Sequence, residues 1–313
     1  MKTKVVIGID TSNYTTSCAV CNMDGVVLEN YKELLPVKEG ERGLRQSDAV
    51  FAHVKNFQII SSRIKEKHAD YEIVSVGYSA YPRDEKGSYM PCFLVGQALG
   101  DMISALYGIP SYKFSHQSGH IQAALYSAKL SVCEPFVAFH VSGGTTEIVL
   151  ATPNEAGFDV TLLGGSVDLH AGQAIDRIGV QMGMSFPCGK YIERLAKENS
   201  MKIPSFKVCV NGMECNLSGL ENLALSLYKD TNDTKLVSAF TLEFLSKTLI
   251  KLTENVRARY KDVKIVYAGG VMSNKIIQGN IARYFNDVYF AEPEFSADNA
   301  CGIALLTYKK YFE

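Results

Sequence analysis

The sequence predicts an α/β protein built from two duplicated lobes with a cleft between them. Apolar strand-like runs alternate with amphipathic helical segments along the chain, an order that gives sheets covered by helices. The segments VVIGIDTSNYTTSCAV (5–20) and VAFHVSGGTTEIVLAT (137–152) align as one strand–turn–strand unit used twice. We therefore expect an N-terminal lobe over 1–133 and a C-terminal lobe over 134–313, with the last helix able to pack back on the N-terminal lobe.

The N-terminal half begins with three strands and continues with alternating helices and strands. The turn between the second and third strands is expected at Asp24–Gly25, and apolar residues at helical spacing follow Ser47. In order, the expected elements are strands at 4–10, 15–22 and 26–32, a helix at 47–68, a strand at 72–80, a helix near 92–107, a strand at 112–114 and a helix that carries His116 and His120.

The C-terminal half repeats this order. Its first strand is an apolar run that ends in a Gly-Gly turn, and its longest helical pattern covers 28 residues, from 233 to 260. The expected elements are strands at 136–144, 145–152 and 158–165, a helix at 167–183, the long helix near 233–260, a strand at 263–270, a helix after Ser273, a strand at 287–292 and a last helix near 297–311.

Composition limits the classes of function. The 313 residues are 47% hydrophobic with a net charge of −1, so a stand-alone nucleic-acid binder, which is usually basic, is not the expectation. No apolar run is long enough to span a membrane, and no signal peptide is evident. The eight cysteines lie scattered in apolar segments, which is typical of buried thiols in a reducing cytoplasm.

Three glycine-rich or hydroxyl-rich turns follow apolar strands. The first two, GIDTSNYTTS (8–17) and VSGGTTE (141–147), can hold phosphate oxygens on their backbone N–H groups, although such residues also simply make tight hairpins. Asp10, at the end of a strand, can bind a metal–phosphate or orient a nucleophile. The third turn, in VYAGGVMSN (266–274), lets a base or ribose approach the backbone. Two such turns in register plus a late Gly-Gly predict the actin, Hsp70 and sugar-kinase fold.

Two histidines suggest a metal site. His116 and His120 stand four residues apart, so on a helix they share a face, and imidazole is a common metal ligand. A metalloprotease helix would carry a Glu after the first His, but Gln117 occupies that place and cannot take a proton, so peptidase chemistry of that type is not expected. A third ligand must come from elsewhere. Asp298 is a candidate, although an Asp at a helix start is also a good cap.

The motifs, taken together, resemble the TsaD family, formerly called O-sialoglycoprotein endopeptidase or glycoprotease. They are HQSGH (116–120), VSGGTTE (141–147), DLHAGQAIDRIG (168–179), NLSGL (216–220), AGGVMSNK (268–275) and EPEFSADNACGIAL (292–305), in the family's order. The resemblance implies two actin-like lobes with an RNase H-like core. It also implies transfer of threonylcarbamoyl from threonylcarbamoyl-AMP to the tRNA adenosine beside the anticodon, with partner proteins of that pathway.

The resemblance also implies site residues. Its metal ligands match His116, His120 and Asp298, with iron or zinc bound. The matches for contacts to the adenylate are His140, Val141, Ser142, Gly143, Gly144, Asp176, Gly189 and Asn274. In that chemistry a divalent ion polarises the reacting carbonyl of a mixed anhydride, and AMP leaves.

The chain departs from the family at several positions. Tyr14 and Thr15 replace an acidic pair, Thr145 replaces a histidine, and YPRDEKGSYMPC (81–92) replaces a Gly-Pro-Gly segment. Two alternatives to tRNA modification therefore remain open. One is a paralogue that transfers a carbamoyl-type group to a small acceptor, and the other is a nucleotide-binding scaffold of a tRNA-modifying complex.

Overall fold

The computed structural model describes residues 2–12, 14–36, 44–155, 157–296 and 300–313. The chain divides into two compact units, each with its own sheet. Unit 1 comprises Met1–Ser131, Pro153–Asp159 and Ala297–Glu313, and unit 2 comprises Val132–Thr152 and Val160–Ser296. The C-terminal segment thus belongs to the same unit as the N-terminus.

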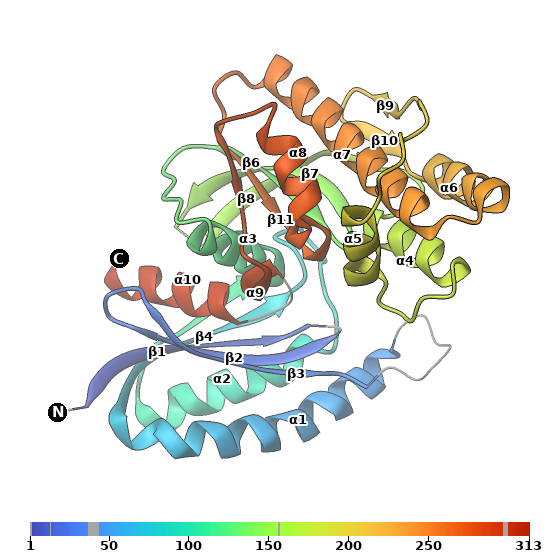
Figure 1. Ribbon diagram of the computed structural model, residues 1–313. Helices are drawn as coiled ribbons and strands as arrows, with labels where there is room; N and C mark the ends of the chain where they lie inside the picture. The colour runs from blue at the N-terminus through green and yellow to red at the C-terminus, as the bar shows by residue number, and fades with distance from the viewer. Residues whose placement is uncertain (1, 13, 37–43, 156, 297–299) are drawn as a thin grey trace. The chain divides into compact units, whose positions relative to one another are not determined.

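Unit 1 has a five-stranded sheet in the order β3-β2-β1-β4-β5. Figure 1 shows helices α1 and α2 on one face of this sheet and α10 on the other, where α10 also packs against α3. Strand β1 is antiparallel to β2 and parallel to β4, and β4 is parallel to β5. The elements are β1 (Thr3–Thr11), β2 (Thr15–Asn22), β3 (Val27–Leu34), α1 (Gln46–Lys67), a 3-10 turn (His68–Asp70), β4 (Tyr71–Tyr81), α2 (Phe93–Tyr107), β5 (Ser111–Ser115), α3 (His116–Ser127) and α10 (Cys301–Phe312).

Unit 2 repeats that topology and adds a hairpin. Its seven-stranded sheet runs β12-β11-β6-β7-β8-β10-β9, so the order β8-β7-β6-β11-β12 matches β3-β2-β1-β4-β5 of unit 1. The elements are β6 (Phe136–Val141), β7 (Thr146–Asn154), β8 (Gly157–Ser166), α4 (Ala171–Gln181), α5 (Gly189–Lys197), β9 (Cys209–Asn211), β10 (Glu214–Asn216), α6 (Ser218–Thr231), α7 (Thr234–Arg259), β11 (Ile265–Ala268), a 3-10 turn (Gly270–Ser273), α8 (Lys275–Ala282), β12 (Val288–Phe290) and α9 (Pro293–Ser296). The predicted repeat is confirmed.

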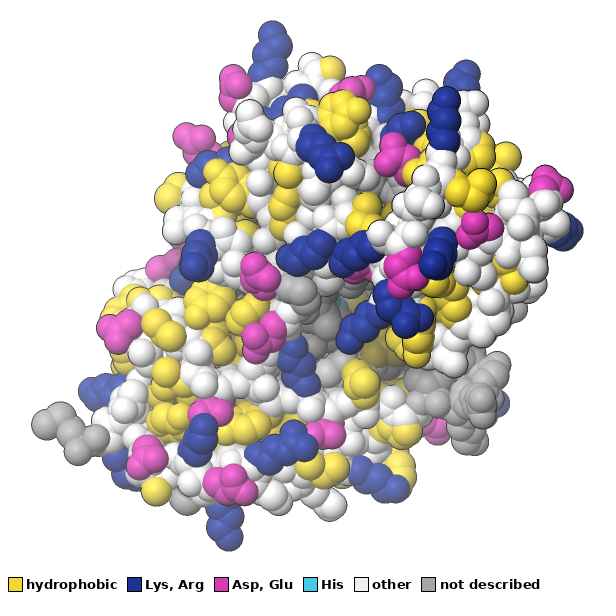
Figure 2. Space-filling view, viewed as in Figure 1, with side chains coloured by type: hydrophobic (Ala, Val, Ile, Leu, Met, Phe, Trp, Pro, Cys, Tyr) yellow, Lys and Arg dark blue, Asp and Glu magenta, His cyan; other side chains and the backbone are white. Residues whose placement is uncertain are grey.

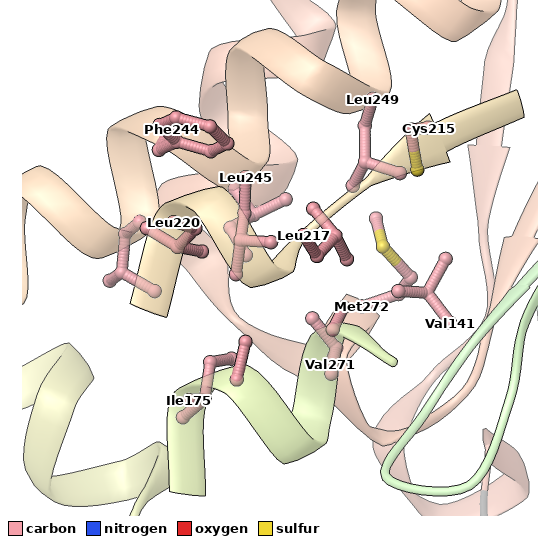
Figure 3. Packing of buried hydrophobic residues seen from close by; sticks show 14 of the residues in the cluster. Val141, Ile175, Cys215, Leu217, Leu220, Phe244, Leu245, Leu249, Val271 and Met272 are labelled. Atoms are coloured by element: carbon pink, nitrogen blue, oxygen red, sulfur yellow. The ribbon is translucent and has the colours of Figure 1, made fainter. Parts of the chain in front are cut away.

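The core of unit 2 surrounds α7, which packs against α5, α6 and α8. Figure 3 shows Leu245 and Leu249 of α7 turned toward Leu217, with Val271 and Ile175 at the other side of the cluster. Burial of such side chains contributes about 1.5–3 kcal/mol each.

The side-chain carboxylate of Asp168 holds the start of α6 in place. Asp168 accepts hydrogen bonds from the N–H groups of Leu169 (2.6 Å), Leu217 (2.8 Å) and Ser218 (3.2 Å), and from the Ser218 hydroxyl (2.6 Å). Burial alone would raise the pKa of Asp168, but these bonds outweigh it and hold the pKa well below its ordinary value.

Within the described segments, none of the helices combines the length and the apolar character that crossing a bilayer requires. The surface is mixed in charge. On the face in Figure 2, Lys and Arg side chains are interspersed with Asp and Glu, in keeping with the net charge of −1.

Candidate functional site

The histidine pair lies at the start of α3 in unit 1. Strand β5 leads directly into this helix, and Ser115 caps it by accepting a hydrogen bond from the N–H of Ser118 at 3.0 Å. His116 and His120 are therefore one turn apart, with their Nε2 atoms 2.9 Å from each other. Two nitrogens bound at about 2.0–2.1 Å to one ion and at right angles to each other are separated by about this distance. The pair fits as two adjacent ligands of one cation.

The other ring nitrogen of His116 faces a buried carboxylate. Its Nδ1 lies 2.9 Å from Oδ1 of Asp10, whose side chain is fully buried at the end of β1. The Ser79 hydroxyl donates to the same oxygen at 2.5 Å. The ring of Phe93 packs 5.7 Å from the His116 ring, so the orientation of the imidazole is fixed from several directions.

The third predicted metal ligand, Asp298, lies outside the described residues. Among those that are described, no third His, Cys, Asp or Glu joins the histidine pair in a group that could hold a metal ion. The helix that follows, α10, packs against α3 at the turn between the two histidines: a Cβ on Gly302 would lie 1.7 Å from the backbone oxygen of Gly119. The start of α10 is therefore held beside the histidine-bearing turn.

Unit 2 contains a pocket of about 740 Å³. Four of the residues predicted to contact the adenylate line it together: Gly143, Asp176, Gly189 and Asn274. The other four are not among its lining residues. Val141 is buried in the core (Figure 3), His140 is partly buried on β6, Ser142 closes a turn, and Gly144 faces open space.

The Ser-Gly-Gly turn is built like the turn in the first hairpin. In the turn after β6, the N–H of Ser142 donates to the carbonyl of Thr145 (2.7 Å) and the N–H of Thr145 to the Ser142 hydroxyl (3.1 Å). Ser12 and Thr15 make the same two bonds, each of 3.2 Å, in unit 1. The two predicted hairpins thus have one hydrogen-bonding pattern.

Helix α4 begins against the second of these turns. The N–H of Gly172 donates to the carbonyl of Ser142 at 3.0 Å, and a Cβ at Gly172 would come within 2.6 Å of the Cα of Gly143. Only a glycine permits this approach, which brings the positive end of the helix dipole to the pocket. The N–H groups of Ala171 and Gly172 are already donated, to the Thr146 hydroxyl at 2.9 Å and to the Ser142 carbonyl, so the helix start offers an anion its dipole but not these two donors.

Two polar side chains of the pocket are held by backbone groups. Asp176 accepts a hydrogen bond from the N–H of Cys188 at 2.7 Å, and burial raises the pKa of this carboxyl while that bond lowers it. Asn274 caps α8, with its side-chain oxygen accepting from the N–H groups of Ile276 (3.0 Å) and Ile277 (3.1 Å). A ligand contact of Asn274 would therefore use its NH₂ group.

Comparison with known proteins identifies the family. The family model for TsaD, described as tRNA N6-adenosine threonylcarbamoyltransferase, matches residues 64–305. The chain belongs to the TsaD family.

Relatives in this family are similar over almost the full chain. A tRNA N6-adenosine threonylcarbamoyltransferase of Streptococcus suis is 27% identical and covers 99% of this chain and 94% of its own length. A protein of the same name from Pyrobaculum aerophilum is 26% identical, covering 98% of this chain and 87% of its own length.

Solved structures of other families share the fold. HypF from T. kodakarensis superimposes with a TM-score of 0.64 at 13% identity, covering 99% of this chain and 48% of that chain. A ROK family glucokinase from Streptomyces griseus gives 0.53 at 13% identity, covering 97% of this chain and 98% of that chain. At these identities the likeness shows the fold alone, and it confirms the predicted actin and sugar-kinase fold.

Sequence reasoning missed two features of these sites. It did not pair Asp10 with His116, and it did not single out Lys190 and Glu193, which also line the pocket of unit 2. The contact between Asp10 and His116 could have been found from the strand order, because both residues follow or end parallel strands of one sheet.

Proposed function

We propose that this chain is a metal-dependent transferase that moves threonylcarbamoyl from threonylcarbamoyl-AMP to N6 of an adenosine in tRNA, in the cytoplasm. Support comes from the family match over residues 64–305 and from relatives that carry that activity in their names. The observation that carries the proposal is the approach of the Nε2 atoms of His116 and His120 to 2.9 Å, which suits two ligands of one ion.

The proposed metal ligands are His116, His120 and Asp298, with iron or zinc as the ion. Two nitrogen ligands and one carboxylate are a donor set that both ions accept and that leaves coordination positions open. The ion would supply Lewis-acid polarisation of the carbamoyl carbonyl and offset charge on the leaving phosphate. Packing of Gly302 on Gly119 supports Asp298, because it holds the helix after that residue against the turn between the histidines.

The adenylate is proposed to bind in the pocket of unit 2. Asp176 suits a ribose hydroxyl, and burial raises the pKa of its carboxyl. The start of α4 and the backbone of Gly143 suit the phosphate. Gly189 and the NH₂ group of Asn274 complete the contacts with base and ribose. The other four predicted residues do not line the pocket. We propose that they shape the turn next to it; they are His140, Val141, Ser142 and Gly144.

Contacts with tRNA need basic groups. The sequence places a run of them on and after the second half of α7, and three of these already have acidic partners: Lys247 with Glu243 at 3.5 Å, Lys251 with Glu254 at 2.9 Å and Arg257 with Asp287 at 2.5 Å. The pairs of Lys247 and Lys251 are exposed and worth about 0–1 kcal/mol, so a phosphate can displace their acids, whereas Arg257 is largely buried and also donates to the carbonyl of Val263 at 2.6 Å. Partner proteins of the modification pathway are proposed to supply further contacts.

A paralogue with a small acceptor is the second candidate. Tyr14, half-exposed at 50%, and Thr145 stand where the family has an acidic residue and a histidine. Changed turns in a chain that keeps the histidine pair are what a new acceptor would require. A nucleotide-binding scaffold is less well supported, because a scaffold has no need of paired imidazoles.

The test is direct transfer. The purified protein is incubated with threonylcarbamoyl-AMP and unmodified tRNA, with and without the partner proteins of a bacterial relative, and nucleosides are analysed by mass spectrometry. Threonylcarbamoyladenosine is expected with the native chain and with Ser127→Ala, a control at the far end of α3, and is expected to be lost in His120→Ala. Transfer of threonylcarbamoyl to an added small amine without modified adenosine would favour the small-acceptor candidate, and no transfer to either acceptor would refute the transferase.

A further inference from the structure

A buried polar cluster lies behind the histidine pair. Both donors to Asp10, the Nδ1 of His116 and the Ser79 hydroxyl, share its oxygen Oδ1. The other oxygen, Oδ2, is buried and has no hydrogen-bond partner in the described part of the chain. Burying a carboxylate that has one oxygen without a hydrogen bond costs free energy unless neighbouring groups stabilise its charge.

The hydrogen bond to Asp10 decides where the proton of His116 resides. An ionised carboxylate only accepts, so the Nδ1 of His116 must be the donor across their 2.9 Å. The neutral ring then has its lone pair on Nε2, the atom that lies 2.9 Å from the Nε2 of His120. Metal-binding histidines are held in this way by carboxylates on their second nitrogen.

A second buried histidine belongs to the same cluster. His53 of α1 is fully buried, with its Nδ1 2.8 Å from the hydroxyl of Thr16. The NH₂ group of Asn56 already donates to that hydroxyl at 3.0 Å. With one acceptor site taken, the Thr16 hydroxyl is free to donate its one hydrogen to the Nδ1 of His53, an arrangement that puts the proton of the neutral His53 ring on Nε2.

The Nε2 of His53 is buried and has no side-chain hydrogen-bond partner among the described residues. Burial lowers the pKa of His53, while the Ser12 backbone and the charge of Asp10 act in the opposite direction, so Asp10 lies within electrostatic range of this ring. The cluster thus contains a buried imidazole on which the charge of Asp10 acts and a carboxylate oxygen, Oδ2, that has no hydrogen-bond partner among the described residues.

We propose that Asp10 is the positioning residue of the histidine pair: it fixes His116 with Nε2 toward the cation, and His53, held by Thr16 and Asn56, supports the Asp10 charge. The role rests on the metal centre proposed above. It makes Asp10 a residue that acts through His116 and does not itself touch the substrate.

Two readouts test the role without measuring transfer. In metal-free protein, ¹⁵N NMR of the imidazoles reports the tautomer of His116, and competition with a chelating dye gives the dissociation constants of Zn²⁺ and Co²⁺. Asp10→Asn keeps the shape of the side chain but can present its NH₂ group to Nδ1. We expect it to shift His116 toward the Nε2–H tautomer and to weaken metal binding by about 10–100-fold. Asp24→Asn, on an exposed turn of the same unit, is the matched control and should change neither.

A second pair of variants keeps the test decisive if Asp10→Asn does not fold. His53→Phe removes the buried donor and should weaken metal binding, though less than Asp10→Asn, while His53→Gln, which keeps an N–H near the same place, should restore much of it. Unchanged tautomer and metal affinity in folded Asp10→Asn, or equal losses in His53→Phe and His53→Gln, would overturn the positioning role alone. Failure of the native chain to bind either metal would overturn the metal centre and this role with it.

Discussion

Replacing Gly302 by alanine should destabilise unit 1 and weaken its histidine site. Gly302 lies in the first turn of α10 where that helix meets α3. A Cβ there would lie 1.7 Å from the backbone oxygen of Gly119, 2.6 Å from its carbonyl carbon and 3.0 Å from the backbone nitrogen of Ala123. All three neighbours are backbone atoms of α3, so no rotamer change can relieve the overlap and the two helices must move apart.

The expected change in the free energy of unfolding is the balance of two opposing effects. Overpacking of a well-packed contact costs about 1–3 kcal/mol, and more where backbone must move, while exchange of glycine for alanine in a helix gains about 1 kcal/mol. Because only backbone can move here, we expect an overpacking cost of about 3–4 kcal/mol and so a net loss of about 2–3 kcal/mol, which lowers Tm by about 4–12 °C for a unit of this size. The histidine-bearing turn moves with α3, so Zn²⁺ affinity should fall as well.

The matched control is Gly279→Ala in α8, where a Cβ would meet no atom within 4 Å. There the helix-propensity gain acts alone, and the variant should be as stable as the native chain or more stable by up to about 1 kcal/mol. Both variants are compared by calorimetry and urea unfolding. The close helix contact is not what holds α10 in place if Gly302→Ala has the same Tm as the native chain. The same conclusion follows if Gly279→Ala lowers the free energy of unfolding as much as Gly302→Ala does.

Three further substitutions test other parts of the structure. Asp168→Asn should cost about 1–2 kcal/mol at neutral pH. Since the folded pKa of this carboxyl is depressed, its contribution is fully present above the ordinary value near 4 and is lost as pH falls through the folded value, so urea unfolding should show the full variant deficit at pH 7 and a smaller one at pH 3, where the folded carboxyl is still ionised. Gly172→Ala should push the turn at Gly143, lower Tm because the overlap is with backbone atoms, and weaken AMP binding at least about 10-fold by calorimetric titration; native-like affinity would contradict the proposed phosphate position. Tyr267→Phe removes the buried hydrogen bond with Thr253 and should lower unfolding free energy by about 1 kcal/mol; a more stable variant would show that this bond is not favourable.

Local patterns predicted most of the fold because its strands and long helices carry strong periodic signals. The segment TTSCAVCN was expected as a strand at 15–22, and β2 covers those residues; the helix expected near 233–260 is α7 at Thr234–Arg259. The β9–β10 hairpin was missed because each of its strands has only three residues, too few to show a period of two. Its place in the sheet depends on pairing with β8, which no local pattern encodes.

The polar contacts were harder to predict because they join distant segments. His116 meets Asp10 across 106 residues of sequence, and Asp168 meets Ser218 across 50. Each contact forms only after strands far apart in the chain have paired. The sequence also did not predict that His53 is fully buried, because a histidine on an amphipathic helix is exposed about as often as it is buried.

Strand order explains why both candidate sites arise where they do. In unit 1 the parallel strands β1, β4 and β5 bring Asp10, Ser79 and His116 to one edge of the sheet, since each lies at or just after the carboxyl end of its strand. Ligands of open α/β sheets bind at that edge because the strands end there and loops and helix starts begin. In unit 2 the corresponding strands are β6 and β11, and the turns after them supply Gly143 and Gly270 to the pocket. The same position in the repeated topology thus carries imidazoles and a carboxylate in one unit and glycine turns with helix starts in the other. We infer that the repeated topology places both candidate sites at the ends of equivalent strands. The side chains at those ends then give one unit the features of a cation site and the other those of an anion site.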